Sequence, residues 1–232
     1  MIMNTFLPKF LKKAVYLILI FVLGVNCKQN QEKKTIHLDA KEGLTLLMEG
    51  NTRFLENHPL HPDQTLERIR DLKKGQHPYA VVVSCSDSRV PPELVFDQGL
   101  GDLFVIRNAG NIIGDYELGS VEYAVEHLKA PLVIVLGHSQ CGAIGAFIDH
   151  KNDAVPNHIQ NIIDYIKLEP EEMELNESAD NYYEMAIEAN VRHGVHTLQS
   201  SEPVLAKRAE EGEVRIVGAL FHLDTGRITI LE

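Results

Sequence analysis

Four short apolar runs most constrain the fold of this 232-residue chain. They are rich in Val, Ile and Leu and do not alternate with polar residues, which is typical of strands covered on both faces of a parallel sheet. The runs are 79–84, 103–106, 132–136 and 214–221, and helical patterns occur between them around 118–128, 159–166 and 182–198. Strands that alternate with helices predict right-handed crossovers and an α/β domain with a mostly parallel sheet.

Both ends of this region add further elements. The turn Asp224-Thr225-Gly226 followed by residues 227–231 predicts a hairpin that adds an antiparallel edge strand. At the other end, Asp39 can cap a helix whose apolar residues recur at three- and four-residue steps, and a second helix over 64–74 ends at Gly75. We therefore expect a central sheet of four mostly parallel strands plus an antiparallel edge strand, flanked by helices.

The first 31 residues differ in composition, since they contain no acidic side chain. Lys9, Lys12 and Lys13 precede the apolar run 14–25, which has the length of a signal-peptide core and is short for a membrane span. Cys27 follows closely and favours a lipoprotein signal, in which this thiol is lipidated. Ordinary cleavage that leaves a free thiol stays open, because lipoproteins usually carry a small residue where this chain has Asn26.

The chain is thus expected to have a signal peptide over 1–26, a flexible tether over 27–38 and a globular domain over 39–232. An exported protein would lie in the periplasm or be attached to a bacterial membrane through lipid on Cys27 alone. Acidic side chains outnumber basic ones by 33 to 22. This balance makes nucleic acid a poor candidate partner.

Two loops that follow predicted strands carry the residues with metal chemistry. The first strand leads into Cys85-Ser86-Asp87-Ser88-Arg89, and the third leads into Gly137-His138-Ser139-Gln140-Cys141-Gly142. Reactive groups of such sheets lie at the carboxyl ends of the strands. Two sulfur atoms and one imidazole nitrogen suit Zn²⁺, and three protein ligands leave the fourth position open, as in catalytic zinc sites. The sequence therefore predicts that Cys85, His138 and Cys141 bind zinc.

Two alternatives apply to these loops. An exported protein could join Cys85 to Cys141 in a disulfide, although this would leave His138 without a role. Asp87 and Arg89 are two residues apart, so in an extended loop their side chains point the same way and can pair beside the metal. Such a pair would let Asp87 accept a hydrogen bond from zinc-bound water, whereas the alternative is a surface ion pair of small energetic effect.

The motifs together resemble the β-class carbonic anhydrases. They are C-S-D-S-R at 85–89, G-D-L-F-V-I-R-N-A-G-N at 101–111 and G-H-S-Q-C-G-A at 137–143, and the resemblance covers roughly residues 40–232. It implies the β-carbonic anhydrase fold, with residues 39–232 as the catalytic domain. The implied reaction is reversible hydration of carbon dioxide to bicarbonate and a proton, with one Zn²⁺ per chain and zinc-bound hydroxide as the nucleophile. Asp87 and Arg89 would be catalytic, and Asp87 would bind zinc only in a closed, inactive state.

The resemblance also implies a substrate pocket formed by Gln76, Phe104, Tyr123 and Gly142. Active sites of this family lie across a dimer interface, so we expect a homodimer or a higher homo-oligomer. Without the family, Phe104 and Tyr123 would be interpreted as core residues. A regulatory bicarbonate site that some bacterial members build with tryptophan is not implied, because this chain has no tryptophan.

Two other functions fit parts of the pattern. A hydrolase of carbonyl sulfide or carbon disulfide would use the same zinc ligands. A non-catalytic, metal-binding surface lipoprotein could reuse the scaffold of an enzyme, but such a protein would be expected to lose a ligand or the Asp87–Arg89 pair. All five residues are present here, which favours catalysis.

Overall fold

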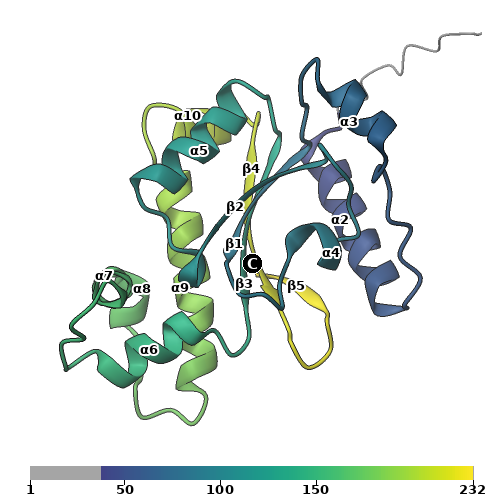
Figure 1. Cartoon of the computed structure of the whole chain (residues 1–232). Coiled ribbons are helices and arrows are strands. Elements are labelled where there is room, and N and C mark those ends of the chain that lie inside the picture. Colours follow the sequence, from purple (N-terminus) through teal and green to yellow (C-terminus); the bar gives the residue numbers. More distant parts are fainter. Residues whose placement is uncertain (1–37, 232) are drawn as a thin grey trace, which may run out of the picture. The chain divides into compact units, whose positions relative to one another are not determined.

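The computed structural model describes residues 38–231, which contain one five-stranded sheet (Figure 1). The strands are β1 (Ala80–Cys85), β2 (Leu103–Asn108), β3 (Leu132–His138), β4 (Arg215–Phe221) and β5 (Ile228–Leu231). Their order is β2-β1-β3-β4-β5; β1 pairs in parallel with β2 and β3, β3 pairs in parallel with β4, and β5 is antiparallel to β4. The predicted sheet with one antiparallel edge strand is confirmed.

Helices follow most of the strands. They are α2 (Ala40–Leu55), α3 (Leu66–Leu72), α4 (Pro92–Val95), α5 (Asp115–Glu126), α6 (Gly142–His150), α7 (Ile159–Lys167), α8 (Pro170–Met173), α9 (Tyr182–Gln199) and α10 (Leu205–Glu210), with a 3₁₀ turn at Ala109–Asn111. Sequence periodicity did not predict α4, α6, α8 and α10, which have four, nine, four and six residues. The two four-residue helices are too short for a repeat to be recognised. No helix within residues 38–231 is long and apolar enough to cross a membrane.

Both faces of the sheet are buried. Val81 and Val133 point to one face, where they pack with apolar residues of α5, α9 and α10. Val82 and Ile134 point to the opposite face, where they pack with residues of α2 and α4. Figure 1 shows these two groups of helices on opposite sides of the strands. Because neighbouring strand residues face opposite ways, covering both faces requires the continuous apolar runs seen in the sequence.

The first helix is fixed at both ends. Asp39 and Glu42 form a capping box, in which each carboxylate accepts the backbone N–H of the other residue, at 2.8 and 2.9 Å. Near the other end, the buried amide of Asn51 donates to the carbonyl oxygens of Val95 and Gly226, at 3.0 and 2.9 Å. These hydrogen bonds attach α2 to α4 and to the β4–β5 hairpin. The packing is close, since a Cβ atom on Gly50 would lie 1.7 Å from the carbonyl oxygen of Phe96.

The N-terminal predictions fall on residues that the structure does not describe. The signal peptide over 1–26, the tether over 27–38 except for its last residue, and the lipidation site Cys27 lie outside residues 38–231.

Candidate metal centre and active site

The three predicted zinc ligands come together at the carboxyl end of the sheet. Cys85 is the last residue of β1, and His138 is the last residue of the adjacent parallel strand β3. Cys141 follows three residues later and directly precedes α6. The two Sγ atoms and an imidazole nitrogen lie within 4.8 Å of one another, and the three side chains are buried. This spacing fits one ion with bonds of about 2.3 Å to sulfur and about 2.0 Å to nitrogen.

The imidazole of His138 presents one nitrogen to this cluster. Nδ1 lies 2.9 Å from the carbonyl oxygen of Ser139. A carbonyl oxygen can only accept, so Nδ1 carries the proton and Nε2 offers a lone pair. Nε2 is buried and has no hydrogen-bond partner among the described residues. Buried nitrogen atoms normally have a partner, and a metal ion bound by the two thiols would supply it.

The two thiols are free, so the alternative of a disulfide between them is wrong for the described residues. A hydrogen bond from the Cys141 thiol lowers the pKa of Cys85, with further support from the N–H of Gly110 and against the effect of burial. The same hydrogen bond and burial raise the pKa of Cys141. One sulfur of the pair is therefore readily deprotonated, which is the form that binds metals.

The 3₁₀ turn after β2 supplies a further donor to the cluster. The N–H of Gly110 points at Sγ of Cys85, at 3.4 Å. Gly110 has φ of +81°, which glycine adopts without strain, and a Cβ atom there would lie 3.0 Å from Cβ of Ala143. The amide of Asn190 holds this turn from α9 by donating to the carbonyl oxygen of Gly110, at 2.9 Å. The segment R-N-A-G-N thus places a backbone amide beside a ligand sulfur.

Asp87 and Arg89 form a bidentate ion pair beside the three predicted zinc ligands. Oδ1 of Asp87 accepts from the backbone N–H and from Nε of Arg89, both at 2.9 Å, and Oδ2 accepts from Nη2 at 2.7 Å. These hydrogen bonds hold the pKa of the Asp87 carboxyl well below its usual range. Oδ2 lies only 3.9 Å from Nε2 of His138. An ionised carboxylate therefore stands next to the ligand cluster while both of its oxygen atoms remain bound to Arg89.

Two side chains that sequence reasoning did not assign hold the loops of the site. Arg107 of β2 donates from Nε to the carbonyl oxygen of Cys85, at 3.0 Å, and from Nη2 to that of Asp87, at 2.7 Å. The hydroxyl of Tyr183, in α9, donates to the carbonyl oxygen of Cys141 at 2.7 Å. Arg107 lies within the motif at 101–111, and this position is the sequence signal that points to a role in the site. Tyr183 is 42 residues from its partner and has no local sequence signal.

Three of the four predicted pocket residues lie away from the cluster of their own chain. The rings of Phe104 and Tyr123 have centroids 6.2 Å apart, and Tyr123 is 48% exposed. Phe104 pairs with Val81, four residues before Cys85, which separates it by about 13 Å along the strand. Gln76 is exposed and precedes β1, at the amino end of the sheet. A single chain therefore does not bring these three residues to the zinc ligands.

Gly142, the fourth residue, follows Cys141 directly. A Cβ atom at Gly142 would meet nothing within 4 Å, so this position faces open space beside the ligands.

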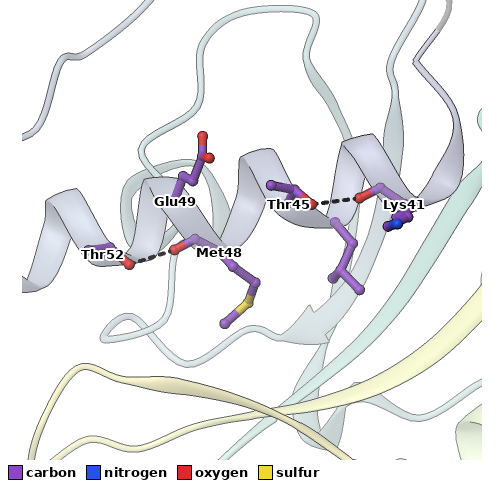
Figure 2. A pocket seen from close by; sticks show the side chains of 6 residues that line it. Lys41, Thr45, Met48, Glu49 and Thr52 are labelled. Atoms are coloured by element: carbon purple, nitrogen blue, oxygen red, sulfur yellow. Dashed lines mark hydrogen bonds between the residues drawn. The ribbon is translucent and has the colours of Figure 1, made fainter.

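A hollow on the surface of α2 contains none of the residues of the Cys-His-Cys cluster. It is lined by Lys41, Leu44, Thr45, Met48, Glu49 and Thr52 (Figure 2). The hydroxyls of Thr45 and Thr52 donate to carbonyl oxygens one turn earlier in the same helix, at 2.9 and 3.0 Å. None of the predicted site residues lines this hollow, so it is separate from the Cys-His-Cys site.

Comparisons with known proteins agree with this site. A family model described as "Carbonic anhydrase" matches residues 80–228, which include every residue of the metal cluster. The carbonic anhydrase of Mycolicibacterium smegmatis is 39% identical over 186 residues, covering 79% of this chain and 89% of that protein.

Solved structures give the same result at the level of the fold. The Coccomyxa β-carbonic anhydrase in complex with acetazolamide has a TM-score of 0.63 and 27% identity, covering 81% of this chain and 86% of that one. A tetrameric β-carbonic anhydrase from Sordaria macrospora has a TM-score of 0.61 and 26% identity, covering 70% and 85%. The chain therefore belongs to the carbonic anhydrase family and, within it, to the β class.

Proposed function

We propose that this chain catalyses the reversible hydration of carbon dioxide to bicarbonate and a proton, with one Zn²⁺ per chain bound by Cys85, His138 and Cys141. One observation carries the proposal: a buried Cys-His-Cys cluster leaves Nε2 of His138 without a partner among the described residues, directly beside a carboxylate held by arginine. When bound there, Zn²⁺ supplies Lewis acidity, which makes hydroxide available near neutral pH.

The Asp87–Arg89 pair orients the reacting water. The lowered pKa keeps Asp87 ionised, so its carboxylate accepts a hydrogen bond and directs the oxygen lone pair toward the carbon atom of the substrate. Arg89 restrains the carboxylate by two hydrogen bonds from its guanidinium and so keeps it from binding the metal itself. In the reaction, one carbon–oxygen bond forms, one C=O electron pair moves onto oxygen, and the proton passes to solvent buffer. A closed state with Asp87 on the metal would be inactive.

A second copy of the chain would complete the substrate pocket. Phe104 lies near the amino end of the edge strand β2, Tyr123 of α5 packs against it, and Gln76 precedes β1. All three are away from the cluster of their own chain, while Gly142 faces open space next to it. A homodimer or higher oligomer in which this edge meets the cluster of a partner would enclose carbon dioxide between apolar rings. The tetrameric structure from Sordaria macrospora supports an oligomer of this kind.

We further propose that the catalytic domain over 39–232 is exported. Cleavage before Cys27 and lipidation of its thiol would attach the protein to a bacterial membrane through a flexible segment. Fractionation of cells that express the full chain tests this: the wild type should sediment with membranes, and Cys27→Ser should not. Equal recovery of both proteins in the soluble fraction would contradict the lipid anchor.

Stopped-flow hydration of carbon dioxide by the purified 27–232 segment, together with its zinc content, tests the main proposal. Hydration with about one zinc per chain is expected, as for a catalytic site with three protein ligands. Zinc binding without hydration between pH 6.5 and 9 would overturn the proposal. Assays with carbonyl sulfide and carbon disulfide on the same sample would then separate a related hydrolase from a protein that only binds metal.

A further inference from the structure

We propose that Arg107 is a positioning residue that fixes the separation between a zinc ligand and the catalytic carboxylate. The inference rests on the proposed function, because it assigns Arg107 to the site that performs it. Its basis is one guanidinium that donates to two backbone carbonyl oxygens of the same loop, those of Cys85 and Asp87, at 3.0 and 2.7 Å.

The register of the sheet puts Arg107 in this place. Arg107 pairs with Ser84 on the parallel strand β1, and Asn108 pairs with Cys85. The ladder continues one step beyond the strand, since the N–H of Ser86 donates to the carbonyl oxygen of Asn108 at 2.7 Å. The chain then leaves the sheet, and the carbonyl of Asp87 has moved beyond the reach of a backbone partner in β2. The side chain of Arg107 extends the pairing by one more residue, to the carbonyl oxygen of Asp87.

This arrangement holds Asp87 at two points with different functions. Arg107 binds its main-chain oxygen, whereas Arg89 binds both oxygen atoms of its carboxylate. Arg89 fixes the carboxylate relative to the loop, and its one contact outside that loop is a long hydrogen bond from Nη2 to the carbonyl oxygen of Gln140, at 3.4 Å. Arg107 restrains the loop relative to the sheet, because its backbone belongs to β2. Since Oδ2 of Asp87 lies 3.9 Å from Nε2 of His138, a small movement of the loop would bring the carboxylate into the metal's open position.

The chemistry of the side chain explains why arginine is needed. A guanidinium is a rigid fork whose Nε and Nη2 can donate in parallel, so one side chain spans two acceptors two residues apart. A lysine carries a single point of charge on a flexible stem and can hold only one of the two carbonyls well. Arg107→Lys should therefore keep part of the restraint on the loop, and Arg107→Met should keep none of it.

The test compares Arg107→Met and Arg107→Lys with a matched control, Arg215→Met. Arg215 is an exposed arginine in the same sheet, but it begins β4 and pairs with Leu132 at the amino end. We expect Arg107→Met to keep its zinc and to lose about 10- to 100-fold in kcat/KM. This is the usual range for residues that orient the ligands of a metal site without binding the metal themselves. Arg107→Lys should fall between Arg107→Met and the wild type, and Arg215→Met should match the wild type.

A double-mutant cycle tests whether Arg107 acts through Asp87. In an Asp87→Asn background, Arg107→Met should lower kcat/KM by less than about twofold, because the group that it positions is already lost. Losses that multiply in the double variant would overturn the proposal. Loss of zinc from Arg107→Met equal to that from Cys85→Ala would also overturn it, since Arg107 would then be holding the ligand and not the carboxylate.

Protein loaded with Co²⁺ gives a readout that does not depend on carbon dioxide. The visible absorption spectrum reports the atoms around the ion, so it should change in Arg107→Met and stay unchanged in Arg215→Met. If the wild type failed to hydrate carbon dioxide while this spectral difference remained, the proposed function would fail and the role of Arg107 would stand. Identical spectra for wild type and Arg107→Met, with zinc-loaded activity also unchanged, would remove Arg107 from the site.

Discussion

Oδ2 of Asp87 lies 3.9 Å from Nε2 of His138, although the same oxygen accepts a 2.7 Å hydrogen bond from Arg89. The carboxylate is therefore close enough to Cys85, His138 and Cys141 to compete for a metal ion bound there, and under the proposed function the guanidinium of Arg89 prevents this. Removing Arg89 and removing Asp87 should thus have different physical consequences, even though both residues belong to one pair.

Arg89→Met should retain zinc and lose at least about tenfold in kcat/KM, because the released carboxylate can bind the metal. Asp87→Asn should also retain zinc and lose activity, since an amide orients water less well than a carboxylate. The zinc content and hydration rates of both variants check this. Loss of zinc from both would show that the pair supports the ligands and has no direct part in the reaction.

His138→Ala should reduce the zinc content from about one per chain to near zero, because two thiols are a poor site without the imidazole. Elemental analysis of the purified protein measures this. His150→Ala, at the end of α6, is the control and should bind zinc like the wild type. If His138→Ala kept its full zinc content, a different set of ligands would have to be sought.

Because of two buried carboxyl groups, we expect the free energy of unfolding to fall as pH rises. Glu169 and Glu172 are 1% and 5% exposed, and none of their carboxyl oxygens has a hydrogen-bond partner among the described residues. Burial, helped for Glu169 by neighbouring acidic groups, raises their pKa to about 9 and about 7 from an ordinary value of 4.5. Between pH 4.5 and about 9 the folded chain thus binds more protons than the unfolded chain, so the free energy of unfolding decreases with pH.

Glu169→Gln removes the larger of these two penalties. At pH 8 the variant should melt at least about 3 °C above the wild type, and at pH 5 the two should nearly coincide. Thermal denaturation of the zinc-loaded proteins at both pH values measures the difference. Glu174→Gln, an exposed position nearby, should show no such pH-dependent gain. A gain for Glu169→Gln that is equal at pH 5 and pH 8 would contradict the assignment to ionisation.

Mixing two defective copies tests whether the pocket is shared between subunits. A His138→Ala copy lacks a zinc ligand, and a Gln76→Ala copy lacks part of the pocket. If each site takes its ligands from one subunit and Gln76 from the other, every mixed dimer contains one intact site. Random pairing then restores about a quarter of the wild-type activity. Activity no higher than the mean of the two separate variants would place both residues in the same subunit's site or remove Gln76 from the pocket.

The sequence by itself determined the order and type of the main elements and the group of three side chains, Cys85, His138 and Cys141, that could hold a metal ion. Short continuous apolar runs between helical patterns are typical of strands covered on both faces, and the carboxyl ends of adjacent parallel strands meet at one edge of the sheet. For this reason the sequence alone predicts that Cys85 and His138, 53 positions apart along the chain, lie together. Short helices such as α4 and α8, of four residues each, could not be predicted, because they are held by tertiary packing and have no periodicity of their own.

Only the tertiary structure decided how the site is held. The contact of Arg107 with Cys85 spans 22 residues, and that of Tyr183 with Cys141 spans 42. Both end on backbone oxygen atoms, which every residue carries, so no residue type in the sequence marks the acceptor. The same holds for the N–H of Gly110 beside Sγ of Cys85 and for the proton on Nδ1 of His138. Ligand identity follows from side-chain chemistry, whereas ligand orientation depends on backbone groups that only the fold brings within reach.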